Sequence, residues 1–257
     1  MTSSCNKKLL VHGALSIGIV TFACQLRAST QIEEKTDRES RRMSTYASCY
    51  EESTGKLSGS HKSRTPVLFS PDGRYRAYAE SEAVASPNAG SEECQNTSKL
   101  FVAGPKSEDF HAVLVIKPIR ERHGNSIDLV DWSPAGHRLL LMEGAWEWGS
   151  DLFGSITRIY DADSETSSSE SVIDRAFLKT MGRHCVAILR PAGFSPSGNL
   201  VIGTGPYFDV GEDSPNKDSC VTKEGLWLVD TAKSTARSLP DDYKVQHYGK
   251  ESPGTGQ

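Results

Sequence analysis

The most informative part of the chain is Val67-Leu68-Phe69-Ser70-Pro71-Asp72-Gly73-Arg74-Tyr75-Arg76-Ala77-Tyr78, because its pattern occurs twice more. The second copy runs from Leu129 to Leu141 and the third from Pro191 to Ile202. Each copy has an aromatic residue, then Ser-Pro-x-Gly, then an apolar run. The aromatic residues stand at 69, 132 and 194, which makes the steps 63 and 62 residues. Such regular spacing indicates a modular fold.

The Ser-Pro-x-Gly segment predicts a type I turn in every copy. Proline fixes φ near the value that the turn requires, and the serine hydroxyl accepts a hydrogen bond from the backbone. Glycine takes the last corner, where a positive φ costs it little. The flanking runs are rich in Val, Leu, Ile, Phe and Tyr and predict strands. Each copy is therefore expected to be a β-hairpin whose aromatic residue ends the incoming strand.

Two further strands are expected after each hairpin. The third strands are residues 99–102, 157–161 and 226–230, and the fourth are 112–116, 172–177 and the weaker 235–239. Four strands in a unit of roughly 60 residues are typical of a β-propeller blade. The prediction is an all-β, propeller-like array of about three four-stranded blades, either incomplete or closed by the termini. A β-sandwich with three similar hairpins is the alternative.

Phe-Ser-Pro-Asp-Gly-Arg-Tyr at 69–75 resembles the repeat of TolB-like and WD40-like propellers and of the propeller domains of prolyl-oligopeptidase-type enzymes. The resemblance covers about residues 64–240, although Ala135 and Ser197 replace the aspartate in the later copies. It implies the fold and says little about function, since such propellers serve as binding platforms, scaffolds and substrate gates. From the residues after 240 we expect no hydrolase domain of the prolyl-oligopeptidase kind.

The chain divides into four expected regions. Residues 1–28 have the lysine pair and short apolar core of an export signal, and they are followed by a polar linker at 29–48. The propeller-like β domain spans 49–240, and 241–257 is expected to be a flexible tail. Cys24 leaves two outcomes open, lipidation of this residue or simple signal cleavage. The protein is expected to be exported, either periplasmic or extracellular, with membrane contact only through such a lipid.

Four cysteines remain in the globular part once the signal is removed, and an exported chain is expected to pair them. Cys49 and Cys185 precede the first strands of their units. Cys94 and Cys220 lie between the second and third strands of the same units. The repeat therefore predicts the disulfides Cys49–Cys94 and Cys185–Cys220. Metal binding is the competing reading, but no Cys-x-x-Cys is present, and no metal is expected.

Three long insertions, 82–98, 144–154 and 206–223, are expected to gather on one propeller face. Loops on a rigid scaffold are the default place for function. The candidate binding residues are Trp146, Glu147, Trp148, Asp151, Tyr207, Phe208 and Asp209. Packing of one or both tryptophans beneath their loop is the competing interpretation, and a calcium site among the acids lacks the spacing of an EF-hand.

Catalytic motifs are absent from the sequence: Gly193-Phe194-Ser195-Pro196-Ser197 is not a nucleophile elbow, and no zinc-protease or phosphate-loop motif occurs. With 29 basic and 33 acidic residues, nothing favours nucleic acid. We therefore predict an exported, non-enzymatic binding or scaffold protein of the cell envelope, without a cofactor, whose partner is another envelope protein. Two alternatives remain: an envelope hydrolase using Glu147, Asp151 and Asp209 on glycan or peptide, and a purely structural protein. The oligomeric state is left open.

Overall fold

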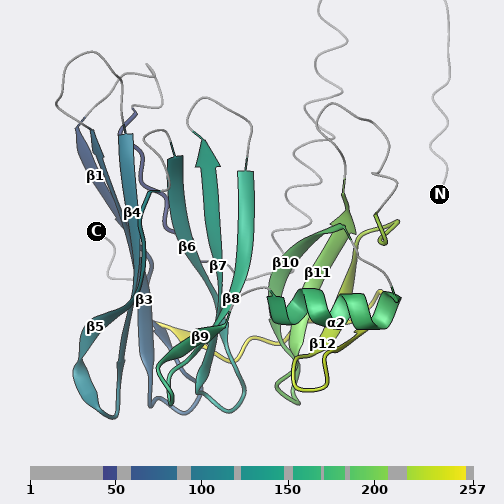
Figure 1. Ribbon diagram of the computed structural model, residues 1–257. Helices are drawn as coiled ribbons and strands as arrows, with labels where there is room; N and C mark the ends of the chain where they lie inside the picture. The colour runs from purple at the N-terminus through teal and green to yellow at the C-terminus, as the bar shows by residue number, and fades with distance from the viewer. Residues whose placement is uncertain are drawn as a thin grey trace, which may run out of the picture. The chain divides into compact units, whose positions relative to one another are not determined.

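The computed structural model describes residues 43–50, 59–85, 94–118, 123–147, 153–168, 171–182, 186–207 and 219–252. These residues belong to one compact unit, Glu39–Gln257, and form three antiparallel sheets together with a single described helix (Figure 1). The all-β prediction is therefore confirmed. The β-sandwich alternative has two sheets, whereas the described chain has three in succession. Among the described residues, these sheets do not form a closed ring.

The first sheet has the order β14-β2-β3-β4-β5, with β1 beside the far half of β3. Its strands are β1 Ser60–Arg64, β2 Leu68–Phe69, β3 Arg76–Ala85, β4 Cys94–Gly104, β5 Ser107–Ile116 and β14 Lys250–Glu251. The last of these comes from the end of the chain and pairs with β2.

The second and third sheets each have four strands in sequence order. The second contains β6 His123–Trp132, β7 Arg138–Glu147, β8 Phe153–Asp161 and β9 Thr166–Ser168. The third contains β10 Ala187–Phe194, β11 Leu200–Pro206, β12 Gly225–Asp230 and β13 Thr235–Ser238. Helix α2, Ser171–Met181, connects the two sheets.

The repeated turns form as the sequence predicts. The glycine N–H donates to the serine carbonyl in all three, at 2.9, 2.8 and 2.8 Å, and Gly73, Gly136 and Gly198 have φ of 73°, 81° and 79°. The serine hydroxyls accept from the backbone N–H of Tyr75, Arg138 and Asn199. Phe69, Trp132 and Phe194 end their incoming strands.

The core lies between successive sheets because side chains alternate along β7. Leu139 and Leu141 pack with the first sheet, in a cluster that includes Trp132 and Leu100. Leu140 packs with the third sheet and with Phe177 of α2. Buried on both faces, the middle strand reads as a continuous apolar run, Leu139-Leu140-Leu141-Met142.

Both ends of the described chain lie along the strands that open the sheets. Met43 exchanges two backbone hydrogen bonds of 2.9 Å with Leu129 of β6. Gln246 pairs with Phe194 of β10, and the next residues continue into β14. This corrects two boundaries, since the predicted linker already packs from Met43 and residues 241–252 of the predicted flexible tail are held against the sheets; 253–257 lie outside the described residues.

Two local predictions are wrong. Residues 172–177, expected to be a strand, lie in α2, because Val172, Ile173, Ala176 and Phe177 follow the helical period and bury one stripe. The described parts of the insertion 82–98 are strand, because β3 continues to Ala85 and β4 begins at Cys94, where alternate side chains are buried against the second sheet.

Asp72, in the first Ser-Pro-x-Gly turn, has a lowered pKa. Burial acts to raise the pKa of the Asp72 carboxyl. Hydrogen bonds from the Ser70 hydroxyl and from the Arg74 side chain and backbone outweigh burial and lower this pKa to about 2. Asp72 therefore favours the folded state while it is ionised.

We expect this stabilisation to be complete above about pH 4 and to be lost as the pH falls through 2, because the folded-state pKa lies below that of the unfolded chain. In Asp72→Asn, the free energy of unfolding should fall less steeply across this range than in the wild type. Urea titrations at several pH values measure both slopes. Parallel slopes would show that Asp72 does not contribute.

Candidate binding site

The two ends of the sheets differ in composition, and each is named here by its residues. The turn end carries the three Ser-Pro-x-Gly turns, 70–73, 133–136 and 195–198. The insertion end is the opposite end, where β3, β7 and β11 finish and β4, β8 and β12 begin.

Contacts between sheets show that these ends coincide from sheet to sheet. At the turn end, a side chain added to Gly136 would meet the Asp72 carboxylate at 2.7 Å, and Arg138 Nη2 donates to the Gly198 carbonyl at 2.6 Å. Toward the insertion end, Asn125 Nδ2 donates to the Asn96 carbonyl at 2.9 Å. The strand ends bordering the three predicted insertions therefore lie on one side, as the repeat predicts.

An aromatic pair stands at the insertion end of the second sheet. Trp146 is the next-to-last residue of β7 and lies over Gly124 of β6. Any side chain at position 124 would collide with the Trp146 indole. The Tyr46 ring packs on it with centroids 5.3 Å apart. Trp146 is half-buried, whereas Tyr46 is 55% exposed. One portion of the Trp146 indole therefore packs on β6, and the pair presents aromatic surface to solvent.

Residues before and after Tyr46 in the sequence hold its segment in place. On one side, the Thr45 hydroxyl donates to the Ile127 carbonyl and accepts from the Ser81 hydroxyl, all of them buried. On the other, Cys49 forms a disulfide with Cys94.

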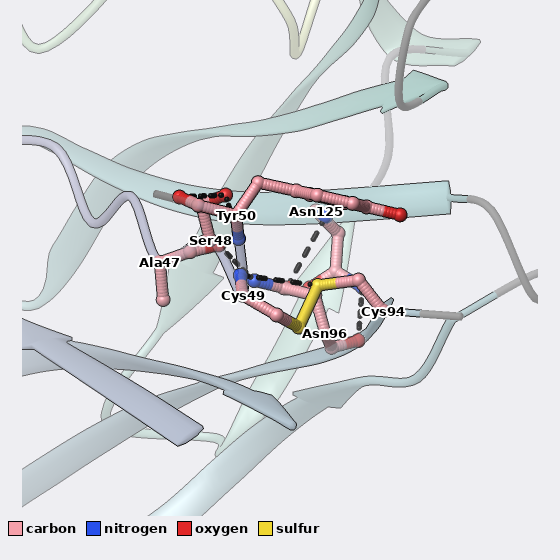
Figure 2. The surroundings of a disulfide bond; sticks show 7 residues. All are labelled: Ala47, Ser48, Cys49, Tyr50, Cys94, Asn96 and Asn125. Carbon is pink, nitrogen blue, oxygen red and sulfur yellow. Dashed lines mark hydrogen bonds between the residues drawn. A yellow bond between two sulfur atoms is a disulfide. The ribbon is translucent and has the colours of Figure 1, made fainter. Parts of the chain in front are cut away.

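Figure 2 shows the surroundings of this disulfide, where Asn96 links three segments. Asn96 Nδ2 donates to the Ala47 carbonyl at 3.0 Å, and Asn96 Oδ1 accepts from the Asn125 backbone N–H at 3.2 Å. The buried amide therefore ties the segment carrying Tyr46 to both the first and the second sheet. Rigid support of this kind lowers the entropy cost of contact by the exposed ring.

The predicted disulfide Cys49–Cys94 is confirmed, with Cα atoms 5.7 Å apart. Cys220 also takes part in a disulfide, while its predicted partner Cys185 lies outside the described residues. Cys24 lies outside them as well.

The other predicted site residues are only partly within the structure. Glu147 follows Trp146 at the end of β7 and is half-exposed. Tyr207 follows β11 at the same end of the third sheet and is 39% exposed, with its backbone N–H donating to the Ser219 hydroxyl. Trp148, Asp151, Phe208 and Asp209 lie outside the described residues, so the structure brings only Trp146, Glu147 and Tyr207 to this end.

A pocket of about 290 Å³ lies elsewhere, between the second sheet, the start of α2 and the β12–β13 turn. Arg138, Asp161 and Thr166 line it and stand directly opposite one another across β7, β8 and β9. Burial acts to raise the pKa of the Asp161 carboxyl, but hydrogen bonds from Ser164 and the nearby His137 lower it overall. The Arg138 and Asp161 side chains are thus engaged by protein groups, in the Gly198 and Ser164 contacts.

The acidic residues at the insertion end are only partly within the described structure. Of the three acids in the hydrolase alternative, Glu147 is described, whereas Asp151 and Asp209 lie outside the described residues. The nearby Glu143 is buried in an ion pair with Arg158. Within the described ranges, no cluster of His, Cys, Asp or Glu is placed to hold a metal ion.

Sequence reasoning missed Tyr46, because it falls in a segment that reads as a polar linker. The cysteine three residues later was the available signal, since a predicted disulfide at Cys49 implies that the preceding residues pack nearby. Among the described residues, no helix has the length and apolar character needed to span a membrane. Comparison with protein-family models and with curated proteins finds no match.

Proposed function

We propose that the chain is an exported, non-enzymatic binding or scaffold protein of the cell envelope, and that its three sheets are blades of a TolB-like propeller. It captures another envelope protein at the insertion end, through Tyr46 and Trp146 with Glu147 beside them. The observation that carries the proposal is the Tyr46–Trp146 pair, exposed on one side and firmly anchored on the other.

Aromatic pairs of this type suit a protein contact for physical reasons. Tyrosine and tryptophan bury a large area with few rotatable bonds, and they dominate the energetics of protein interfaces. Contacts of Thr45, Ala47 and Cys49 hold the segment that carries Tyr46 before any partner arrives, so binding orders little of the chain.

Two further observations support the envelope and propeller parts of the proposal. The Cys49–Cys94 disulfide suits an oxidising compartment such as the periplasm or the cell exterior. Each of the three successive sheets opens with the same hairpin and turn, as blades do. Segments from both ends lie along the strands that open the sheets, in place of a complete fourth blade.

The test is affinity capture of the tagged full-length protein from crosslinked cell envelopes, read by mass spectrometry. We expect one dominant partner for the wild type. Tyr46→Ala/Trp146→Ala should weaken capture by about thirtyfold, which corresponds to a hot-spot contribution of about 2 kcal/mol. Thermal unfolding checks that this variant remains folded.

The matched control is Tyr78→Ala/Phe101→Ala. This second aromatic pair is stacked with centroids 4.8 Å apart on the outer face of the first sheet, away from the insertion end. The Tyr78→Ala/Phe101→Ala variant should capture the partner as the wild type does. Undiminished capture by the Tyr46/Trp146 variant would refute the proposed site.

A further inference from the structure

The strand edges of the three sheets differ in how they are covered. The edge of β2 is paired by β14, that of β6 by Met43 and that of β10 by Gln246. Each of the three inner edges is therefore contacted by a segment from one end of the chain. Such covering is the usual protection against pairing with foreign strands.

The outer edges of the second and third sheets are short. β9 has three residues. β13 has four and packs against α2, whose Thr180 hydroxyl accepts from the Ala236 backbone N–H at 2.8 Å. The edge strand β1 has five residues, and Lys62 and Arg64 give it the charges that discourage strand pairing.

β5 is the exception. It has ten residues and forms the outer edge of the first sheet, and no described segment pairs with it on the side away from β4. From Phe110 to Ile116 it carries no charge other than that of His111 on protonation, and it contains no proline. Val115 is 45% exposed. An open edge that is uncharged from Phe110 to Ile116 is a template for another strand, even though β5 shifts register against β4 at two points.

The charges at the two ends of β5 indicate which strand fits. Glu108 and Asp109 stand at its start, and Lys117 directly follows its end; all three are exposed. An antiparallel copy of β5 places the acidic start of each strand opposite the lysine of the other. A parallel copy would place like charges together.

The side chains on the outer face agree with this antiparallel arrangement. Phe110 lies on that face, where its ring meets Tyr78 edge-on with centroids 4.8 Å apart. Val115 lies opposite Lys99, which shares the face of Phe101. Antiparallel self-pairing with Glu108 opposite Lys117 brings Phe110 against the second copy's Val115, which covers the exposed valine.

We propose that β5 is a dimerisation edge, at which two copies of this chain pair antiparallel about a two-fold axis and join their first sheets into one. The contact is isologous, so it closes on itself and leaves neither β5 edge open. It uses neither Tyr46 nor Trp146 and is independent of the proposed function.

The experiment measures the mass of the full-length protein by size-exclusion chromatography with light scattering over a range of concentrations. We expect the wild type to show twice the monomer mass, and Val115→Lys to raise the dimer dissociation constant at least about tenfold, because it adds two lysines to the pairing edges. Val84→Lys is the matched control: Val84 is also 45% exposed and lies in the same sheet, but on the interior strand β3. The Val84→Lys variant should remain dimeric.

Charge reversal tests the orientation. Lys117→Glu alone and Glu108→Lys/Asp109→Lys alone should each weaken the dimer, and the triple variant should restore it. Arg76 donates a hydrogen bond to the Glu108 backbone carbonyl, so the Glu108 side chain can be exchanged without loss of that bond. A monomeric wild type, a dimer unaffected by Val115→Lys, or a triple variant that stays monomeric would overturn the proposal.

Discussion

Asp131→Ala is expected to lower the free energy of unfolding by about 3–5 kcal/mol, the cost of leaving buried polar groups without their charged partner. Asp131 is fully buried on β6. Its carboxylate accepts the backbone N–H groups of Trp132 at 2.9 Å, Tyr248 at 3.1 Å and Gly249 at 2.8 Å, and His247 Nδ1 lies 3.7 Å away. One side chain thus holds the segment that leads into β14.

The same variant should release that segment locally. β14 pairs with β2 through two residues only, which is too little to hold it without the Asp131 contacts. Hydrogen exchange at the amides of 246–251 should therefore accelerate more than exchange in β7. Urea unfolding gives the stability change, and Asp241→Ala, at a side chain 84% exposed, is the control expected to stay within about 0.5 kcal/mol. An Asp131→Ala protein as stable as this control would refute the role of Asp131 in holding the segment that leads into β14.

Cys49→Ala/Cys94→Ala is expected to cost about 3–4 kcal/mol, because the bond closes a loop of 45 residues in the unfolded chain. The loss of stability is larger than for an exposed disulfide, since both cysteines are fully buried with Ala47 and Ala83. Capture of the envelope partner should also weaken, because Tyr46 loses one of the two ties that flank it. Urea unfolding and the capture assay measure the two effects.

Ser48→Ala is the control for the disulfide variant. The Ser48 hydroxyl makes only local hydrogen bonds, to the backbone of Tyr50, so its loss should cost about 1 kcal/mol or less. If the cysteine pair costs no more than this serine, the disulfide does not stabilise the fold.

Local chemistry explains which features could be predicted. The Ser-Pro-x-Gly turns are determined by the φ preferences of proline and glycine within four residues, so they and their hairpins follow directly. The Cys49–Cys94 pairing follows from the matched placement of cysteines in the repeat. The gathering at one end of the strand ends that border the insertions follows from antiparallel strand order.

Other features depend on contacts distant in sequence. Asp131 binds residues 117 and 118 positions later. β14 consists of two charged residues, so its own sequence does not predict a strand. Met43 and Thr45 read as linker because their partners are Leu129 and Ile127. Residues 172–177 form too short an apolar run for its period alone to distinguish helix from strand.

Site-specific photocrosslinking is the most direct test of where the partner binds. A photoreactive residue is introduced in place of Tyr46 at the insertion end and, separately, in place of the half-exposed Arg74 at the turn end. We predict a crosslink to the envelope partner from position 46 and none from position 74. A crosslink from position 74 with none from position 46 would contradict binding at the insertion end.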